Sequence, residues 1–358
     1  GLFLFSPVAG SINYRLGSPK VLFYGLLGMI AGIFLVAAGI NFSFLVSGMI
    51  IMGIANAFII NANMTLLSEL FPGMIRRIIS LYSALYFGAC ALFSPLIGNW
   101  LKLSSEKGWD FLSFRMPFIV LLLVFIYFAA VTYRFIIPEM LKHPLEMPVE
   151  SKARVNSGKA GFAKWFWVPL LGFFHGLMYI VMISWLSPMA KEKFGANEFQ
   201  GSLFVGVATL GMGLGRLFIA GVKLPWEDRK ILAGGTIAGG LIFFAGLFAP
   251  FYTLSLLLIG TGSFIASTSF PCISSLAGEL FPDMKSKIFG YMYATYAIAG
   301  IVGTPFAGIL ADRGISFSWI LTISSFSALI IGIVSLIWKY TEKRGKDACK
   351  SAKNCKLS

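Results

Sequence analysis

The chain has 358 residues, of which 57% are hydrophobic and only 12% are charged, and its formal net charge is +14. A soluble domain contains roughly 45–50% apolar and about 25% charged residues, and a water-soluble fold of this size could not bury so much apolar surface. The composition therefore excludes a soluble enzyme, a secreted disulfide scaffold and a disordered chain. It predicts an all-α membrane protein with several spanning helices.

Ten apolar stretches are long enough to cross a bilayer, which takes about 20 residues in a helix. They cover residues 21–41, 43–68, 78–101, 116–136, 165–190, 201–222, 231–252, 253–278, 288–311 and 319–339. An eleventh apolar segment, from Gly1 to about Ile12, is too short to span. We therefore expect the chain to begin inside a helix whose first part is missing.

A polar stretch with three prolines and several basic residues, residues 138–164, separates two groups of spans. Its composition predicts a linker between an N-terminal helical half, residues 1–137, and a C-terminal helical half, residues 165–340. A basic tail follows at residues 341–358. Most of the 29 Lys and Arg residues lie in the linker, the tail and the loops on the same side. Because cytoplasmic loops carry excess positive charge, the linker and the C-terminus are predicted to be cytoplasmic, in a cell membrane.

The sequence repeats itself at an offset of 210 residues. Residues 69–74 (ELFPGM) align with residues 279–284 (ELFPDM), and further identities follow through the next span. At this offset, the counterpart of residues 165–190 and part of the counterpart of residues 201–222 lie outside the sequence. The complete protein is therefore expected to have two pseudo-symmetric halves of six helices, with about 11 segments of 12 present. Parallel six-helix repeats joined by a cytoplasmic linker are a known transporter architecture.

A loop motif is formed by Gly10, Arg15, Gly17 and Lys20. With one extra residue near its end, it resembles the loop Gly-x-x-x-Asp-Arg-x-Gly-Arg-Lys between the second and third helices of the major facilitator superfamily. Tyr14 stands where the family usually has Asp, which weakens any salt bridge expected of this loop. The resemblance covers essentially the whole chain and implies the family's fold of two helical halves.

A second motif lies at the inside end of the span at 43–68. Glu69-Leu-Phe-Pro, followed by Arg76 and Arg77, is similar to the family's Glu-x-x-Pro-x-x-x-Arg. Glu279 and Lys287 repeat it in the second half. The recurrence predicts a cytoplasmic gate, in which Glu69 pairs with Arg76 or Arg77 and Glu279 pairs with Lys285 or Lys287.

Within the superfamily, the short sequence segments Phe270-Pro271 and Gly213-Leu-Gly-Arg216 resemble those of the fucose-permease-like group. The acidic residue that such permeases carry in the helix after the linker is missing from this chain. Tyr179 or His175 occupies that region.

Polar residues within the spans are candidates for function, because they are costly in hydrocarbon and usually face the bundle interior. Arg216 could hold an anion in the cavity, or it could close a gate or extend to the interface. His175 could contact solute or relay a proton, or it could bond to a neighbouring helix as a neutral ring. Residues near the middle of their helices in both halves are predicted to form the solute site: Asn56, Tyr86, His175, Tyr179, Ser267 and Tyr296.

The predicted site residues favour an uncharged polyhydroxyl solute over a strong ion. Tyr86 and Tyr296 are related by the repeat and could stack on a sugar-like or aromatic solute. They could equally be two packed aromatic residues. An anionic solute remains the rival, because Arg216 lies only slightly farther along its helix.

We find no catalytic constellation, phosphate-binding loop or metal-ligand spacing in the sequence. No enzymatic activity, cofactor or nucleic-acid partner is therefore expected. The predicted function is secondary active transport, as a symporter or uniporter, of a small polar organic solute (sugar-like or organic acid) by alternating access. Protons or another ion could be coupled, and the protein is expected to act as a monomer in the lipid bilayer. The alternative is a transporter-like solute receptor or sensor without flux.

Overall fold

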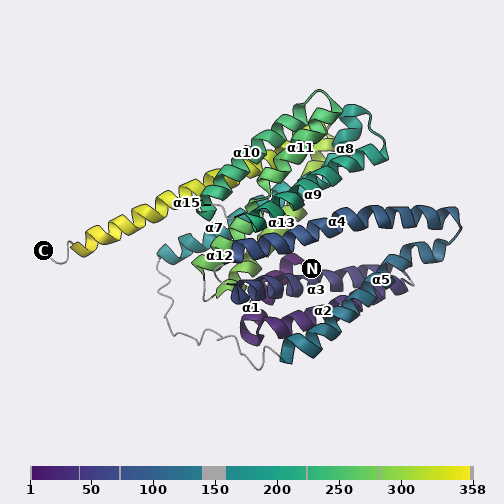
Figure 1. Cartoon of the computed structure of the whole chain (residues 1–358), viewed down its shortest axis with the longest axis horizontal. Coiled ribbons are helices and arrows are strands. Elements are labelled where there is room, and N and C mark those ends of the chain that lie inside the picture. The colour runs from purple at the N-terminus through teal and green to yellow at the C-terminus, as the bar shows by residue number, and fades with distance from the viewer. Residues whose placement is uncertain are drawn as a thin grey trace. The chain divides into compact units, whose positions relative to one another are not determined.

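The computed structural model describes residues 2–39, 41–71, 74–138, 159–222, 225–281 and 284–354, so the predicted linker lies largely outside the described residues. Within these ranges all regular secondary structure is helical (Figure 1). In the described part of the chain, ten helical stretches are long and apolar enough to cross a membrane: Ser18–Ala38, Phe42–Leu70, Ile75–Phe93, Arg115–Ile136, Phe166–Phe194, Phe199–Gly221, Asp228–Phe248, Tyr252–Leu280, Lys285–Asp312 and Phe317–Trp338. They fall where the sequence predicts spans, which confirms the predicted all-α membrane fold.

Contacts divide the chain into two compact units, and the first contains Gly1–Pro169 and Ala277–Ile298. Its helices include α1 (Leu2–Leu16), α2 (Ser18–Ala38), α3 (Phe42–Leu70), α4 (Ile75–Glu106), α5 (Asp110–Val131) and the π-helical turn η2 (Thr132–Ile136). Helix α2 is central: Val21, Leu22 and Leu26 form a buried cluster with Ala62 of α3 and Ala129 of α5. The first part of α13 (Lys285–Asp312), up to Ile298, also belongs to this unit.

The second unit contains Leu170–Leu276 and Ala299–Ser358. Its elements include the end of α7 (Lys159–Gly176), η3 (Leu177–Val181), α8 (Met182–Phe194), α9 (Glu198–Gly221), α10 (Asp228–Phe248), α11 (Tyr252–Ala266), the first part of α12 (Ser269–Leu280), the rest of α13, α14 (Phe317–Ile320) and α15 (Thr322–Asn354). Helix α10 is central here, because it packs on both α11 and α15 (Figure 1).

The helix boundaries follow the internal repeat. Helices α2 and α10 begin and end 210 residues apart, and α4 and α13 begin 210 residues apart. Helix α3 covers residues 42–70, and its counterpart covers residues 252–280 with one difference. The counterpart is broken into α11 and α12 at residues 267–268, whereas α3 is continuous.

The repeat preserves a close backbone contact in each unit. A Cβ placed on Gly25 of α2 would lie 3.3 Å from the Ala55 carbonyl oxygen of α3. A Cβ placed on Gly235 of α10 would lie 3.1 Å from the Ile265 carbonyl oxygen of α11. Gly235 stands 210 positions after Gly25, and Ile265 stands 210 positions after Ala55. Small residues at such positions let the backbones of membrane helices approach closely.

Cations stabilise the ends of the two central helices. Arg115 donates hydrogen bonds to the carbonyl oxygens of Ala37 at 3.1 Å and Gly39 at 3.3 Å, at the C-terminus of α2. Lys193 donates to the carbonyl oxygens of Leu247 at 2.6 Å and Ala249 at 2.8 Å, at the C-terminus of α10. Because the last carbonyls of a helix carry partial negative charge and have no partner within the helix, both contacts are favourable.

Some boundaries differ from those predicted from hydropathy. The first segment extends to Leu16 rather than Ile12, and α4 covers residues 75–106 rather than 78–101. Helix α15 continues to Asn354, so the basic tail is helical over most of its length. Hydropathy underestimates these helices, because polar turns can continue a helix beyond the hydrocarbon. The predicted division into residues 1–137, 138–164, 165–340 and 341–358 stays a prediction.

Gly239→Ala should lower the melting temperature of the protein in detergent. A Cβ at this position of α10 would lie 2.5 Å from the Ala266 nitrogen and 2.7 Å from the Gly262 carbonyl oxygen. Overpacking of this kind typically costs about 1–3 kcal/mol. Gly234→Ala is the matched control in the same helix, since no atom lies within 4 Å of a Cβ placed there. Equal loss of stability in the two variants would contradict the close packing of α10 on α11.

Candidate functional site

In the first unit, the beginning of α13 lies against α1 and α3. A Cβ placed on Gly10 of α1 would lie 2.7 Å from the Ser286 carbonyl oxygen. A Cβ placed on Gly290 of α13 would lie 2.6 Å from the Ser6 carbonyl oxygen. A segment of the second sequence repeat is thus in direct backbone contact with a helix of the first.

A buried network of uncharged hydrogen bonds joins these three helices. Asn13 donates to Asn61 Oδ1 at 3.0 Å, and Asn61 Nδ2 donates to the Ser286 carbonyl oxygen at 2.9 Å. The Ser286 hydroxyl lies 2.8 Å from the Gly10 carbonyl oxygen and 3.1 Å from Asn61 Oδ1. We call Asn13, Asn61 and Ser286 the amide cluster. Each of its hydrogen bonds contributes about 0.5–1.5 kcal/mol, which is small enough for the cluster to open and close.

Charged residues lie on two of the helices that form the amide cluster, α3 and α13. Glu69 accepts a hydrogen bond from the Ser18 side chain and interacts electrostatically with Lys285. Lys285 Nζ also donates to the Ser68 carbonyl oxygen at 3.2 Å. Lys287 Nζ lies 4.4 Å from the centre of the Tyr14 ring, the residue that replaces the family's usual Asp.

The structure therefore gives Glu69 a neighbour from the second repeat. Arg76 and Arg77 are half-buried near the start of α4, and Glu279 is exposed at the end of α12. The predicted pairs of Glu69 with Arg76 or Arg77, and of Glu279 with Lys285 or Lys287, stay predictions.

In the second unit, a two-residue turn interrupts the helix between α11 and α12. Helix α11 ends at Ala266, Ser267 and Thr268 form the connection, and α12 begins at Ser269. Pro271 in the first turn of α12 lacks an N–H and cannot continue the hydrogen-bond ladder of α11. Hydroxyl side chains in the connection also compete for backbone groups, which favours a helix end.

Four side chains meet at this break, of which three are buried and Phe270 is half-buried. The His175 Nδ1 and the Ser269 hydroxyl are hydrogen-bonded at 3.1 Å. The Phe270 ring lies 5.5 Å from the His175 ring, and the Arg216 guanidinium carbon lies 5.4 Å from the Phe270 ring centre. His175 and Arg216 are each only 4% exposed. The ring of Phe270 thus contacts an imidazole and a guanidinium.

Ser267 is directed at the helix that carries Arg216. A Cβ placed on Gly215 of α9 would collide with the Ser267 hydroxyl and the Phe264 carbonyl oxygen. The Ser267 side chain is 0% exposed, and among the described residues its hydroxyl has no hydrogen-bond partner. The absence of a side chain at Gly215 lets the break approach α9 beside Arg216.

The π-helical turn η3 follows His175 directly and contains Tyr179. Single π-turns within helices occur frequently at functional sites. Tyr179 is buried, four residues after His175. The second unit therefore contains three of the predicted solute-binding residues, of which Ser267 and His175 lie at or beside the break.

The other three predicted solute-binding residues belong to the first unit. Asn56 is half-buried in the middle of α3, and Tyr296 is half-buried in α13. The Tyr86 side chain is 56% exposed and packs edge-on against Phe87 at 5.3 Å. The predicted site as a whole stays a prediction.

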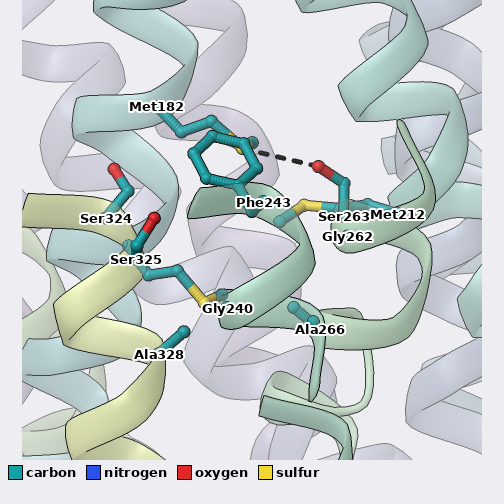
Figure 2. Close-up of a pocket in the computed structure, with 12 residues that line it drawn as sticks. Met182, Met212, Gly240, Phe243, Gly262, Ser263, Ala266, Ser324, Ser325 and Ala328 are labelled. Atoms are coloured by element: carbon teal, nitrogen blue, oxygen red, sulfur yellow. Dashed lines mark hydrogen bonds between the residues drawn. The ribbon is translucent and has the colours of Figure 1, made fainter. Parts of the chain in front are cut away.

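A small cavity lies inside the second unit, between Met182, Met212, Phe243, Ser263 and Ser325 (Figure 2). Its volume is about 20 Å³. A cavity needs about 10–15 Å³ to hold one water molecule, whereas ligand pockets are roughly 300–1,000 Å³. This cavity is therefore too small for an organic solute.

Several residues of both sites were not predicted from the sequence. Asn13 and Asn61 are polar residues inside apolar helices, a signal that could have identified them. Ser286 has no such signal, because a serine is common near a helix start. Ser269 and Phe270 could have been found from the Ser-Thr-Ser-Phe-Pro run, which is typical of a helix interruption.

Asn61→Ala should loosen the contact between α3 and α13, because it removes both hydrogen bonds to Ser286 and one to Asn13. A cysteine placed at Ser6, in a background without the native cysteines, reports on this contact through its rate of maleimide labelling. We expect the rate to rise about tenfold, because losing ~1.4 kcal/mol of hydrogen-bond free energy shifts the opening equilibrium tenfold. Asn63→Ala is the control, since Asn63 bonds instead to Tyr82. An unchanged labelling rate in Asn61→Ala would show that the amide cluster does not hold the contact.

Glu69→Gln should also increase labelling at this position, because it removes the attraction to Lys285 but keeps a hydrogen-bond acceptor for Ser18. The increase should shrink partly at high salt, since Glu69 and Lys285 are half-buried and such a pair is screened less than an exposed one. Glu192→Gln is the control, because Glu192 accepts a hydrogen bond from the Phe317 N–H in the second unit. A salt-independent increase would contradict an electrostatic role for Glu69.

Comparison with known proteins agrees with this architecture. The sequence pattern of the Major Facilitator Superfamily matches residues 1–223 and 170–354. An uncharacterized transporter of Buchnera aphidicola subsp. Acyrthosiphon pisum (strain APS) is 26% identical over 151 residues, which are 42% of this chain and 35% of that protein. The matched region thus spans about a third of that relative's length.

Two solved structures share the fold. A Major Facilitator Superfamily transporter, FucP, in the outward conformation superposes with a TM-score of 0.74 at 17% identity, covering 94% of this chain and 87% of that one. The human organic anion transporter MFSD10 (TETRAN) superposes with a TM-score of 0.66 at 18% identity, covering 93% and 80%. At these identities the likeness concerns the fold. The family pattern across the chain, together with ten apolar spans, shows that this multi-pass membrane protein belongs to the Major Facilitator Superfamily of transporters.

Proposed function

We propose that the protein is a secondary active transporter that moves a small polar organic solute, sugar-like or an organic acid, by alternating access. The contact of α13 with α1 and α3 is the observation that carries the proposal. It joins a segment of the second repeat to the first through uncharged hydrogen bonds and glycine contacts. A carrier that alternates between two states needs contacts of this kind, which are specific but individually weak.

The placement of the polar side chains supports a solute site near the middle of the spans. His175, Tyr179 and Ser267 lie within helices that are otherwise apolar, near a break and a π-helical turn. In secondary transporters, interrupted helices at the midplane supply the polar groups that bind the solute. We propose that Asn56, Tyr86 and Tyr296 complete the site from the first unit.

The orientation and coupling belong to the same proposal. The excess of positive charge in the linker and tail supports a cytoplasmic location for both, in a cell membrane. The amide cluster and Glu69 then lie at the cytoplasmic gate, together with Arg76, Arg77, Glu279 and Lys287. We propose a monomer that works as a symporter or uniporter, with protons or another ion as the coupled species in the first case.

A solute receptor or sensor is the second candidate, because a buried polar site could serve binding alone. The two candidates differ in one property. A transporter must open the contact between α13 and α3 in every cycle, whereas a receptor can bind its solute with this contact closed.

A reversible crosslink at the amide cluster tests the proposal. The Asn61→Cys/Ser286→Cys variant, without the native cysteines, places two thiols where the parent side chains touch at 3.1 Å. In proteoliposomes, we expect uptake of radiolabelled solutes from a panel of sugars and organic acids when the thiols are reduced. Oxidation should abolish this uptake, and dithiothreitol should restore it. Each single-cysteine variant is the control and should be insensitive to the oxidant.

The outcome separates the two candidates. Solute binding without uptake in the reduced, folded protein would contradict transport and favour the receptor. Uptake that continues at full rate in the crosslinked protein would show that the contact of α13 with α3 is not a gate.

A further inference from the structure

The helix break in the second unit brings two positive groups together. Helix α12 has 12 residues, and its N-terminus carries a partial positive charge. The N–H groups of its first turn that could serve a ligand are those of Ser269 and Phe270, since Pro271 has no N–H and the Cys272 N–H donates to the Thr268 carbonyl oxygen. Arg216 lies over the ring of Phe270, the second residue of α12. It stands five residues before the end of α9, which at ~1.5 Å per residue is about 8 Å inside the helix.

A cation beside a helix N-terminus is unfavourable by itself, because both groups have the same sign. The repulsion is stronger at a buried position, where the effective dielectric constant is lower than in water. An anion between the two groups turns the repulsion into two attractions. Helix N-termini and arginine side chains are both common binding groups for carboxylates.

Ser267 is the independent observation that points to a ligand. Its hydroxyl is fully buried, has no hydrogen-bond partner among the described residues, and faces Gly215 next to Arg216. Burying a hydroxyl without a partner costs about 1–3 kcal/mol. A ligand oxygen at this place would accept a hydrogen bond from Ser267 and remove that cost.

The remaining groups at the break fit the same ligand. The Ser269 hydroxyl and the His175 ring are hydrogen-bonded to each other, which holds the hydroxyl at the first turn of α12. The Phe270 ring supplies an apolar wall beside Arg216. One guanidinium neutralises one carboxylate and binds it through two parallel hydrogen bonds.

We propose that the break between α11 and α12 is a binding site for the carboxylate of an organic anion, with Arg216 as its charged partner and Ser267 and the first turn of α12 as hydrogen-bond donors. The proposal rests on the function proposed above and specifies its solute class. It changes the preference that the sequence indicated, which was for an uncharged polyhydroxyl solute. The chain positions this site through Gly215, whose missing side chain admits Ser267.

Matched pairs of probes test the charge requirement. We would titrate the purified protein with gluconate and glucitol, lactate and propane-1,2-diol, and benzoate and benzyl alcohol. The members of each pair differ in having a carboxylate or a primary alcohol. At least one carboxylate should raise the melting temperature of the protein, and its alcohol partner should not.

Variants locate the binding site. Arg216→Gln should weaken binding of that carboxylate by about 10- to 100-fold, the range for loss of a hydrogen bond to a charged group. Arg216→Lys should retain part of the affinity, because it keeps the charge without the planar fork. Ser267→Ala should weaken binding by about 2- to 10-fold. Arg229→Gln is the matched control and should bind normally, since Arg229 lies over Trp338 at 4.8 Å.

Three results would overturn the proposal: no carboxylate stabilises the protein, the alcohols stabilise it equally, or carboxylate binding survives in Arg216→Gln. Stronger stabilisation by inorganic phosphate than by any carboxylate would overturn the solute class. Uptake assays distinguish a failure of the carboxylate site from a failure of the proposed transport function. Glucitol uptake that survives Arg216→Gln would uphold transport and reject the carboxylate site. Arg216-dependent carboxylate binding without uptake would uphold the site and reject transport.

Discussion

A backbone polar group in hydrocarbon has no water to bond to, and this constraint governs the whole structure. A spanning segment must be helical, since a helix satisfies its own N–H and C=O groups. At a helix end, the last carbonyl oxygens have no N–H partner within the helix, and side chains from other helices donate hydrogen bonds to them instead. Arg115 and Lys193 donate to the last carbonyls of α2 and α10, the central helices of the two units. An interruption within a span is tolerated only inside protein or at a cavity, and Ser267 and Ser269 at the break are accordingly buried.

The two repeats share the packing of their helices, but equivalent positions in them do not always have the same structural role. Gly25 and Gly235 make equivalent backbone contacts, because the same helices cross at the same positions in both units. Asn61 and Pro271 also occupy equivalent positions, 210 residues apart, yet their effects differ. Asn61 continues α3 and joins the amide cluster, whereas Pro271 belongs to the first turn after a helix break. The same position of the repeat thus makes a contact between helices in the first repeat and follows a helix break in the second.

The two polar sites have different energetic character, which fits the roles proposed for them. The amide cluster consists of neutral groups joined by hydrogen bonds, and only Asn13 Oδ1 among them lacks a partner in the described residues. Opening it therefore costs only a few modest hydrogen bonds. The break has a buried guanidinium that lies over the Phe270 ring, and the buried Ser267 hydroxyl, which has no hydrogen-bond partner among the described residues. A site of the first kind can change between states without a ligand. A site of the second kind gains stability when a ligand of complementary charge arrives, and it can therefore couple binding to the balance of states.

The sequence by itself determined the spans, the helical fold and the repeat. Each of these depends on properties that are local or periodic: the length of the apolar stretches, and an offset that recurs without gaps. Motifs such as Glu69-Leu-Phe-Pro also indicated the family, and the pattern match across the chain confirms it.

Only the tertiary structure decided which polar residues meet. Asn61 and Ser286 are separated by 225 residues, and sequence reasoning chose Asn56 on the same helix instead. Spans that are apolar on all sides give no sequence signal for which face of each helix points to its neighbour. Arg216, Phe270 and His175 likewise come together only because α9, α12 and α7 pack with particular rotations about their axes. Those rotations are set by close contacts such as that at Gly215, which exist only in the folded chain.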